Sequence, residues 1–272
     1  MSGVCRYLGM TRQNYYARRR RRQRRRVEGQ LLEGLVGRER RQQARLGTRK
    51  LHYRLREELH AAGVKVGRDR FFAELKQRDL LVPRKPRAWP RTTQVGKVLP
   101  PIGNRIKGLK IQRPNEVWVS DLTYVRTKES FAFLSLITDA MSRKIVGYHL
   151  GESLETMGCL AALEMALASL PQSGCRPIHH SDRGCQYHSH DYVTKLRAHG
   201  LGISMTEQDH CAENALAERM NGILKQEYGL GEEFPSLSHL RQAVDQAVWL
   251  YNHQRPHTAL GYDYPARVHD QN

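Results

Sequence analysis

The charge of this chain changes sign along its length, and no other feature constrains its organisation as strongly. Residues 1–113 contain 32 Lys and Arg against 8 Asp and Glu, whereas residues 114–272 contain 13 against 19. Lys and Arg neutralise phosphate and support salt-sensitive binding of nucleic acid. The pattern predicts a nucleic-acid-binding front half and an acidic back half that can gather carboxylates around cations. A solvated basic surface without a specific ligand is the alternative.

The front half divides into three segments. Residues 1–43 form a basic N-terminal helical arm, in which Gly9 supplies a turn and Thr11 an N-cap. Eight arginines between positions 18 and 26 cannot pack in a core, so this arm either lies along a DNA backbone or is a solvated linker. The arginines that we expect to contact DNA are Arg18, Arg19, Arg20, Arg24 and Arg25.

Residues 44–82 resemble a helix-turn-helix, because two amphipathic helices are separated by a turn at Gly63 and Gly67. Leu51, Leu55 and Leu59 recur at helical spacing in the first helix, and the inward residues of the second are expected to be Phe71, Phe72 and Leu75. Arg68 and Arg70 fall on polar faces and are predicted DNA contacts. A proline-rich basic linker follows over residues 83–113.

Beyond residue 114 the hydrophobic period changes from helical to alternating. Three consecutive strands are predicted at 117–126, 131–138 and 144–150, and they form an antiparallel meander. Helices at 154–170, 192–199, 211–228 and 237–253 then alternate with short strands at 177–180 and 201–205. This order predicts a mixed five-stranded α/β sheet of the ribonuclease H-like type over residues 114–272.

Three carboxylates stand out by their placement in this layout. Asp121 lies in the middle of an apolar strand, where a carboxylate is costly unless it is paired or binds metal. Asp182 directly follows a strand, at the end where α/β sheets form their sites. Glu218 lies in a helix. Magnesium prefers oxygen ligands, and two ions can stabilise the attacking and leaving oxygens of a phosphoryl displacement. These three acids are therefore the predicted catalytic and metal-binding residues, with Mn²⁺ as a substitute for Mg²⁺.

The helix that carries Glu218 presents two different sides. Asn214, Glu218, Gly222 and Lys225 share one stripe, whereas apolar residues such as Met220 point elsewhere and can pack. Glu218 can therefore face a site, and Lys225 is placed to contact a phosphate. Because carboxylates without metal repel one another, at least one of the three is expected to titrate with a raised pKa.

Four motifs, WVSDLTYV, HSDRGCQY, ENALAERMNGILKQEY and YNHQRPHTALGY, resemble the transposases of bacterial insertion sequences of family three, and specifically their second-reading-frame product. The N-terminal LGMTRQNYY and GTRKLHYRLREEL segments resemble the same proteins. The resemblance implies an integrase core related to retroviral integrases, with metal bound by Asp121, Asp182 and Glu218. It implies cleavage at the element ends and attack of the freed 3′-hydroxyl on target DNA.

The resemblance also implies partners. The first is DNA, both the terminal inverted repeats and the target. The protein is also expected to form a homo-oligomer in the synaptic complex and to act as a fusion with the upstream first-frame product. No zinc is expected, because the His/Cys module of retroviral integrases is absent from the sequence. Five cysteines without a CxxC pair indicate reduced thiols, and no apolar run matches a membrane span. We expect a cytoplasmic, nucleoid-associated protein.

Several other residues are candidates for supporting roles, each with a structural alternative. Arg183 and Gln186 are predicted to contact DNA near the metals. His179 and His180 either orient water or phosphate or are structural, and Asn214 either supports the site or caps its helix. In the closing motif Arg255 either grips a phosphate or ties the tail to the core. Trp118 and Trp249 are interpreted as core aromatics.

Two other functions fit part of the sequence. A nuclease that cuts RNA–DNA hybrids would share the fold, but it would need no large basic module. A non-enzymatic DNA binder, such as a repressor of its own element, would not need the three acids. DNA strand transfer by a metal-dependent polynucleotidyl transferase uses both features, and it is the predicted function.

Overall fold

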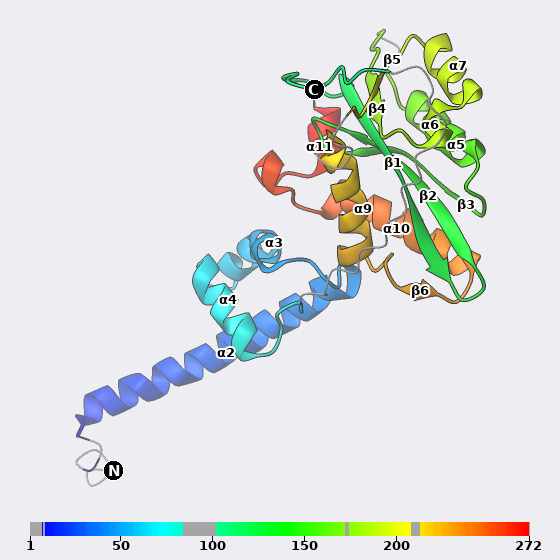
Figure 1. Cartoon of the computed structure of the whole chain (residues 1–272). Coiled ribbons are helices and arrows are strands. Elements are labelled where there is room, and N and C mark those ends of the chain that lie inside the picture. Colours follow the sequence, from blue (N-terminus) through cyan, green and yellow to red (C-terminus); the bar gives the residue numbers. More distant parts are fainter. Residues whose placement is uncertain (1–6, 8, 84–101, 172–173, 208–212, 272) are drawn as a thin grey trace. The chain divides into compact units, whose positions relative to one another are not determined.

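The computed structural model describes residues 7, 9–83, 102–171, 174–207 and 213–271. The chain divides into two compact units, Met1–Arg84 and Lys85–Asn272 (Figure 1). Most of the proline-rich segment predicted for the linker lies outside the described residues. No helix in the described ranges combines the length and the apolar character that crossing a membrane requires.

Within residues 7 and 9–83, the first unit contains the helices α2 (Arg12–Gln42), α3 (Thr48–Ala61) and α4 (Arg68–Gln77). The Thr11 hydroxyl accepts a hydrogen bond from the amide of Asn14 at 3.2 Å and caps α2, as expected. The arginine-rich run is part of α2, and the residues of α2 that are buried begin only at Gly29. Thus the basic half of this helix is exposed over most of its surface.

One hydrophobic cluster joins helices α2, α3 and α4. Its members include Leu32 and Val36 of α2, Leu51, Leu55 and Leu59 of α3, and Phe71 and Leu75 of α4. The prediction that Phe72 also points inward is wrong, because 48% of its side chain is exposed. Phe71 and Leu75 are one helical turn apart and define the buried stripe, which leaves the next position on the outer side of α4.

The second unit is built on a mixed sheet. Its strands are β1 (Val117–Thr127), β2 (Phe131–Asp139), β3 (Ile145–Gly151), β4 (Ile178–Ser181), β5 (Gly202–Met205) and β6 (Glu233–Phe234). The order is β3-β2-β1-β4-β5, with an antiparallel β1–β2–β3 meander and parallel β1–β4 and β4–β5 pairs. The mixed α/β fold is confirmed. The two-residue β6, which pairs with β1 at Arg126 and Thr127, adds a sixth strand that no alternation in the sequence indicates.

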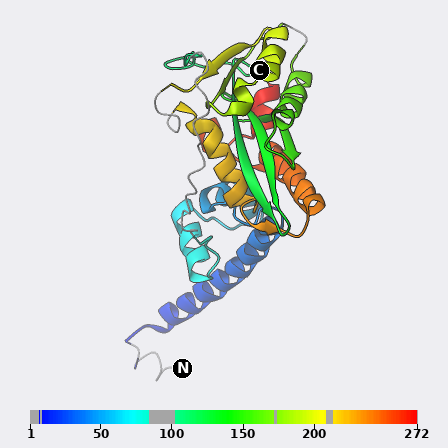
Figure 2. The same cartoon turned by 45° about the vertical axis from the view of Figure 1, so that its right-hand side comes forward.

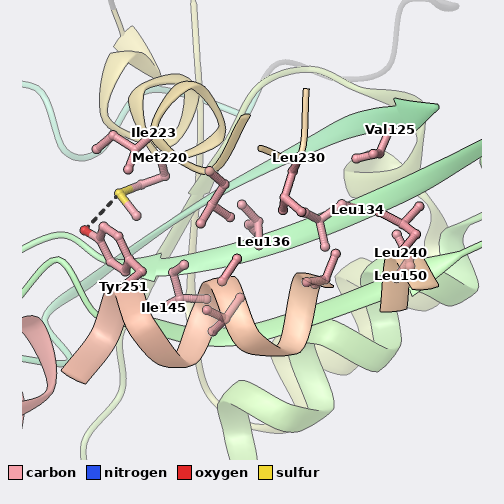
Figure 3. Packing of buried hydrophobic residues seen from close by; sticks show 14 of the residues in the cluster. Val125, Leu134, Leu136, Ile145, Leu150, Met220, Ile223, Leu230, Leu240 and Tyr251 are labelled. Carbon is pink, nitrogen blue, oxygen red and sulfur yellow. Dashed lines mark hydrogen bonds between the residues drawn. The ribbon is translucent and has the colours of Figure 1, made fainter. Parts of the chain in front are cut away.

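Helices cover both faces of this sheet (Figures 1 and 2). One face packs against α5 (Thr156–Ala168), α6 (Cys185–His188) and α7 (His190–Ala198), and Trp118 is fully buried there. The other packs against α9 (Ala215–Glu227) and α10 (Leu237–Gln254) through a cluster of aliphatic side chains and Tyr251 (Figure 3). The sheet thus holds β1 rigidly between two apolar layers.

The expectation that Trp249 is a core aromatic is wrong, because 52% of its side chain is exposed. It lies on the outer face of α10 and stacks on His253 at a ring-centroid distance of 5.3 Å. The inner face of α10 is supplied by residues such as Leu240, Val244 and Tyr251, so the buried stripe is complete without the tryptophan.

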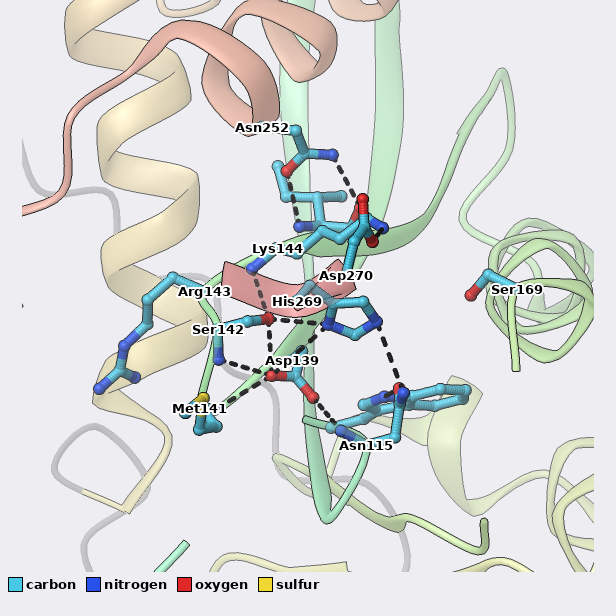
Figure 4. Close-up of polar contacts among 12 residues, drawn as sticks. Asn115, Asp139, Met141, Ser142, Arg143, Lys144, Ser169, Asn252, His269 and Asp270 are labelled. Carbon is cyan, nitrogen blue, oxygen red and sulfur yellow. Dashed lines mark hydrogen bonds and ion pairs between the residues drawn. The ribbon is translucent and has the colours of Figure 1, made fainter. Parts of the chain in front are cut away.

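The C-terminal segment returns to the sheet through η1 (Thr258–Leu260) and α11 (Pro265–Asp270). A buried polar network fastens it (Figure 4). Asp139 accepts hydrogen bonds from the amide of Asn115 and from both the amide and the hydroxyl of Ser142, each at 2.7 Å. The Ser142 hydroxyl also contacts His269 of α11 at 2.9 Å. The chain end therefore braces the turn between β2 and β3.

Candidate active site

Asp121 and Asp182 occupy matching positions on neighbouring strands. In the parallel β1–β4 pair, Ser120 is the partner of Ser181. Asp121 follows Ser120 within β1, and Asp182 follows Ser181 directly after the end of β4. Partners in parallel strands project to the same face of a sheet. The two carboxylates consequently leave the sheet side by side, at the point where β4 ends.

Asp121 is half-buried and its charge is poorly solvated. Burial raises the pKa of its carboxyl from the ordinary 3.8 to about 7, and the negative charge of Asp182 is the second cause. A weaker contribution in the same direction comes from Glu218. Two hydrogen bonds oppose the shift. The side-chain amide of Asn221 donates to Oδ2 at 2.8 Å, and the backbone amide of Leu122 donates to Oδ1 at 2.9 Å. The expectation that one acid titrates with a raised pKa agrees with this environment.

Two asparagines attach α9 to β1 on either side of Glu218. Asn214, at the N-cap of the helix, donates its side-chain amide to the carbonyl of Ser120 at 3.1 Å. It makes no capping hydrogen bond, so of its two predicted roles the structure supports the bond to the site. Asn221 bonds Asp121 itself. Glu218 is exposed and lies between them on the same stripe of α9.

Asn221 was not among the residues singled out from the sequence. It stands among the apolar residues that bury α9, and only 6% of it is exposed. A polar residue three positions after Glu218, on the same helical face, is the signal that could have found it.

The residues fit a divalent cation, although no ready-made site is formed. Among the described residues, no group of three or more His, Cys, Asp and Glu side chains is gathered closely enough to hold a metal ion. Asp121 is nevertheless desolvated and repelled by the charge of Asp182, and a bound cation would relieve both effects. Their carboxylate oxygens are hard donors of the kind that Mg²⁺ prefers.

The two histidines before Asp182 are buried and serve the core. His179 Nε2 lies 2.7 Å from the Ser120 hydroxyl and 2.9 Å from the Tyr192 hydroxyl, and burial lowers the pKa of His179 to about 3. His180 Nδ1 lies 2.9 Å from the Ser204 hydroxyl, and burial also lowers its pKa. Both imidazoles are therefore neutral at physiological pH, and their contacts support the structural alternative.

Arg183 and Gln186 are engaged with backbone carbonyl groups. Arg183 donates to Thr206 at 2.6 Å, and Gln186, which is buried, donates to Leu154 at 2.9 Å. The contacts with DNA that we predicted for them stay predictions.

Arg255 is only 2% exposed and forms two hydrogen bonds of 2.8 Å with Glu227 at the end of α9. Asn252 bonds both backbone groups of Ile145. These contacts favour the tail-anchoring alternative over a phosphate grip.

Lys225 extends the stripe of Glu218 and Asn221 by one further turn. Its ammonium group lies 4.7 Å from the ring centroid of Tyr124, a cation–π contact. Burial lowers its pKa, while the charge of Asp121 acts in the opposite direction. Lys225 is therefore a half-buried cation held near the carboxylates.

The arginines of the first unit that we predicted to contact DNA differ in how far they are engaged in ion pairs. Arg18, Arg19, Arg20, Arg24 and Arg25 of α2 are exposed. Arg24 and Arg70 both bind the carboxylate of Glu28, at 2.8 and 2.6 Å. The bond from Arg70 joins α4 to α2, whereas Arg68 pairs, among the described side chains, with the adjacent and exposed Asp69 at 3.0 Å. Arg68 is therefore the freer of the two arginines of α4.

Comparisons with known families agree with this fold and site. Two models described as "Integrase core domain" match residues 111–211 and 199–265. A cryo-EM structure of the simian T-cell lymphotropic virus intasome in complex with PP2A regulatory subunit B56 gamma shares the fold, with a TM-score of 0.50 and 19% identity over 82% of this chain and 70% of that one. The fold and the matched residues define an integrase core.

Relatives of higher identity specify the family. The chain is 34% identical to the insertion element IS600 uncharacterized 31 kDa protein of Shigella sonnei, over 98% of each protein. It is 34% identical to the transposase InsF for insertion sequence IS3fB of Escherichia coli, over 58% of this chain and 55% of that protein. The chain belongs to the transposases of insertion sequence family three. It is accordingly a polynucleotidyl transferase of DNA transposition.

Most of the other relatives are matched over a part of their length. The transposase for insertion sequence element IS629 of Shigella sonnei is 35% identical over 58% of this chain and 52% of its own length. The matched segment thus spans about half of such relatives, in contrast to the full-length match with the IS600 protein.

Proposed function

We propose that this transposase cleaves the ends of its element and transfers the freed 3′-hydroxyl to target DNA at Asp121, Asp182 and Glu218. Two divalent cations, Mg²⁺ or its substitute Mn²⁺, would be held by these acids, and no zinc is required. The observation that carries the proposal is the pair of neighbouring aspartates, in which burial and the charge of Asp182 raise the pKa of Asp121.

Each residue of the site has a distinct part in this proposal. Bound divalent cations would supply charge neutralisation for the attacking and leaving oxygens of an in-line phosphoryl displacement. Asp121 would hold a cation as its carboxylate, because only the deprotonated form binds metal strongly. Asn221 and Asn214 hold α9 so that Glu218 faces the aspartates. Lys225 is positioned to contact a phosphate of the bound strand.

The basic first unit supplies binding to the element ends in this proposal. Residues 1–43 form a basic arm along the DNA backbone, residues 44–82 a helix-turn-helix-like region, residues 83–113 a linker and residues 114–272 the catalytic core. The exposed arginines of α2 support the first of these assignments. Bringing two ends together requires a homo-oligomer, and we include fusion with the upstream first-frame product and association with the nucleoid in the proposal.

The proposal is tested with the full chain and duplex DNA that carries the inverted repeats flanking the gene. With Mg²⁺, the protein should nick 3′ ends and join them. Asp121→Ala, Asp182→Ala and Glu218→Ala should abolish both reactions and leave DNA binding intact. Glu155→Ala is the matched control, because Glu155 is an exposed carboxylate without a capping bond at the start of α5.

Two outcomes would overturn the proposal. Joining retained by Glu218→Ala would remove that residue from the site. Hydrolysis of the DNA or of RNA–DNA hybrids without any joined product would assign the chain to the nucleases of the same fold. Salt titrations supply a separate readout for the arm, since replacing exposed arginines of α2 with alanine should lower affinity for all duplexes and reduce the salt dependence.

A further inference from the structure

Two aromatic rings stand between two cations along the hairpin that β1 forms with β2. The Lys225 ammonium lies over Tyr124, 4.7 Å from the ring centroid. Tyr124 meets Phe131 edge to face, with centroids 5.7 Å apart and planes at 87°. The Arg126 guanidinium carbon lies 5.3 Å from the centroid of Phe131. We call these four residues the hairpin ladder.

The hairpin ladder is accessible to a ligand. Phe131 is 46% exposed, Arg126 is exposed, and Tyr124 is half-buried. The hairpin does not depend on these rings for its backbone pairing, which runs from Trp118–Asp139 to Arg126–Phe131. An exposed phenylalanine between a tyrosine ring and a guanidinium gains little by packing on its own sheet, whereas its open face suits another flat, apolar group.

The hairpin ladder begins at the candidate active site. Lys225 is one turn after Asn221, which bonds Asp121, and the charge of Asp121 acts on Lys225. A strand rises roughly 3.3 Å per residue, so Tyr124 and Arg126 lie roughly 10 and 17 Å along β1 from Asp121. Both are an odd number of residues from Asp121, so their side chains leave β1 on the opposite face, and Lys225, which feels the charge of Asp121 and lies over Tyr124, connects the two sides. A strand of DNA that ends at the carboxylates could therefore reach the ladder by passing Lys225.

Cations placed beside aromatic rings are the chemistry that binds single-stranded nucleic acid. Cations contact successive phosphates, and the faces of unpaired bases stack on the rings whatever their sequence. Bases inside a duplex do not offer these faces. We propose that the hairpin ladder binds unpaired bases of the DNA strand whose end lies at Asp121 and Asp182, so that this transposase prefers frayed or overhanging ends. This inference rests on the proposed function for the identity of that strand.

The test uses the full chain in EDTA, where no cleavage competes with binding. Three fluorescent probes are compared: a short oligothymidylate, a blunt duplex, and the same duplex with an unpaired 3′ extension. Phe131→Ala and Phe131→Leu should each reduce the preference for the extended over the blunt duplex by roughly fivefold or more. Phe131→Trp should preserve the preference and show tryptophan quenching on the extended probe alone.

Two control variants separate stacking from charge and from hydrophobic area. Lys128→Ala removes an exposed cation of the same hairpin that is outside the ladder, and Trp249→Ala removes an exposed ring on α10. Both should keep the preference for the extended duplex. The proposal is overturned if Phe131→Ala binds all three probes as the wild type does, or weakens all three equally.

The two proposals fail separately. Should the wild type neither nick nor join DNA while Phe131→Ala still loses the preference for the extended duplex, the ladder stands and the catalytic assignment falls. Should Asp121→Ala abolish joining while the wild type shows no preference among blunt and extended duplexes, the catalytic assignment stands and the ladder falls.

Discussion

The side-chain amide of Asn221 donates a 2.8 Å hydrogen bond to Oδ2 of Asp121, and so joins helix α9 to the central strand at the carboxylate itself. The other oxygen of Asp121, Oδ1, accepts a hydrogen bond from the backbone amide of Leu122. The bond from Asn221 orients a carboxylate that would otherwise rotate, and it partly offsets the rise in the pKa of Asp121 caused by burial.

Asn221→Ala should lower Mn²⁺ affinity and DNA joining by roughly tenfold to a hundredfold, the usual cost of losing a residue that orients a metal ligand. Isothermal titration with Mn²⁺ measures the first effect and a joining assay the second. Gln226→Ala is the control, since Gln226 is an exposed amide of the same helix. Unchanged Mn²⁺ affinity in Asn221→Ala would show that the bond has no positioning role.

Asp121 should make the metal-free protein less stable as the pH rises. Its folded pKa of about 7 is above the ordinary value of 3.8, so the folded state keeps a proton that the unfolded state releases between these values. The free energy of unfolding that this group contributes is therefore lost as the pH rises from about 4 to about 7. The loss is at most roughly 4 kcal/mol, because one pKa unit corresponds to about 1.36 kcal/mol.

Urea unfolding in EDTA checks this expectation. Asp121→Asn should be more stable than the wild type at pH 8, and the difference should shrink at pH 5. A constant difference between the two pH values would contradict the raised pKa.

His179 should have the opposite pH dependence. Burial lowers the pKa of His179 in the folded state from 6.5 to about 3. Between these pH values the unfolded state is protonated and the folded state is not. The contribution is intact above pH 6.5 and is lost as the pH falls towards 3. His179→Gln should thus lose more stability relative to the wild type at pH 7 than at pH 5, again by urea unfolding. Equal losses would mean that the imidazole is charged in the folded protein.

The Arg255–Glu227 pair should act on stability. Because Arg255 is almost wholly buried, Glu227→Ala would strand its charge and should cost roughly 3 kcal/mol or more. Arg255→Lys should not rescue the lost stability, since lysine cannot form both hydrogen bonds to the carboxylate. Thermal unfolding gives the magnitude. If Arg255→Lys weakens DNA binding at unchanged stability, the phosphate grip is the better account of Arg255.

Gly147 marks a close approach of strand β3 to helix α5. A Cβ added there would lie 2.2 Å from the carbonyl oxygen of Ala162, a backbone atom that cannot turn aside. Gly147→Ala should therefore destabilise the second unit by roughly 1–3 kcal/mol. Gly151→Ala in the same strand is the control, because its added Cβ would meet nothing closer than 3.7 Å. Comparable unfolding temperatures for the two variants would refute the close contact.

The sequence predicted β1 to β5 but not β6, and it predicted the places of Asp121 and Asp182 on the strands, because alternation over a half-buried sheet is a strong signal and a carboxylate within it stands out. It misplaced Phe72 and Trp249, since large apolar residues also occupy surfaces and periodicity alone does not tell which stripe is buried. The bond from Asn221 to Asp121 joins residues 100 positions apart, and such a pairing exists only once α9 is laid against β1.

The two amides that fasten α9 to β1 stand seven residues apart, close to two full turns. Deleting or inserting a single residue between Asn214 and Asn221 would rotate one bond by about 100° and release it from the sheet. The length of this interval is therefore fixed by geometry, whichever side chains fill the positions between. Surface loops elsewhere can grow or shrink during evolution, but this short stretch can change only by substitution.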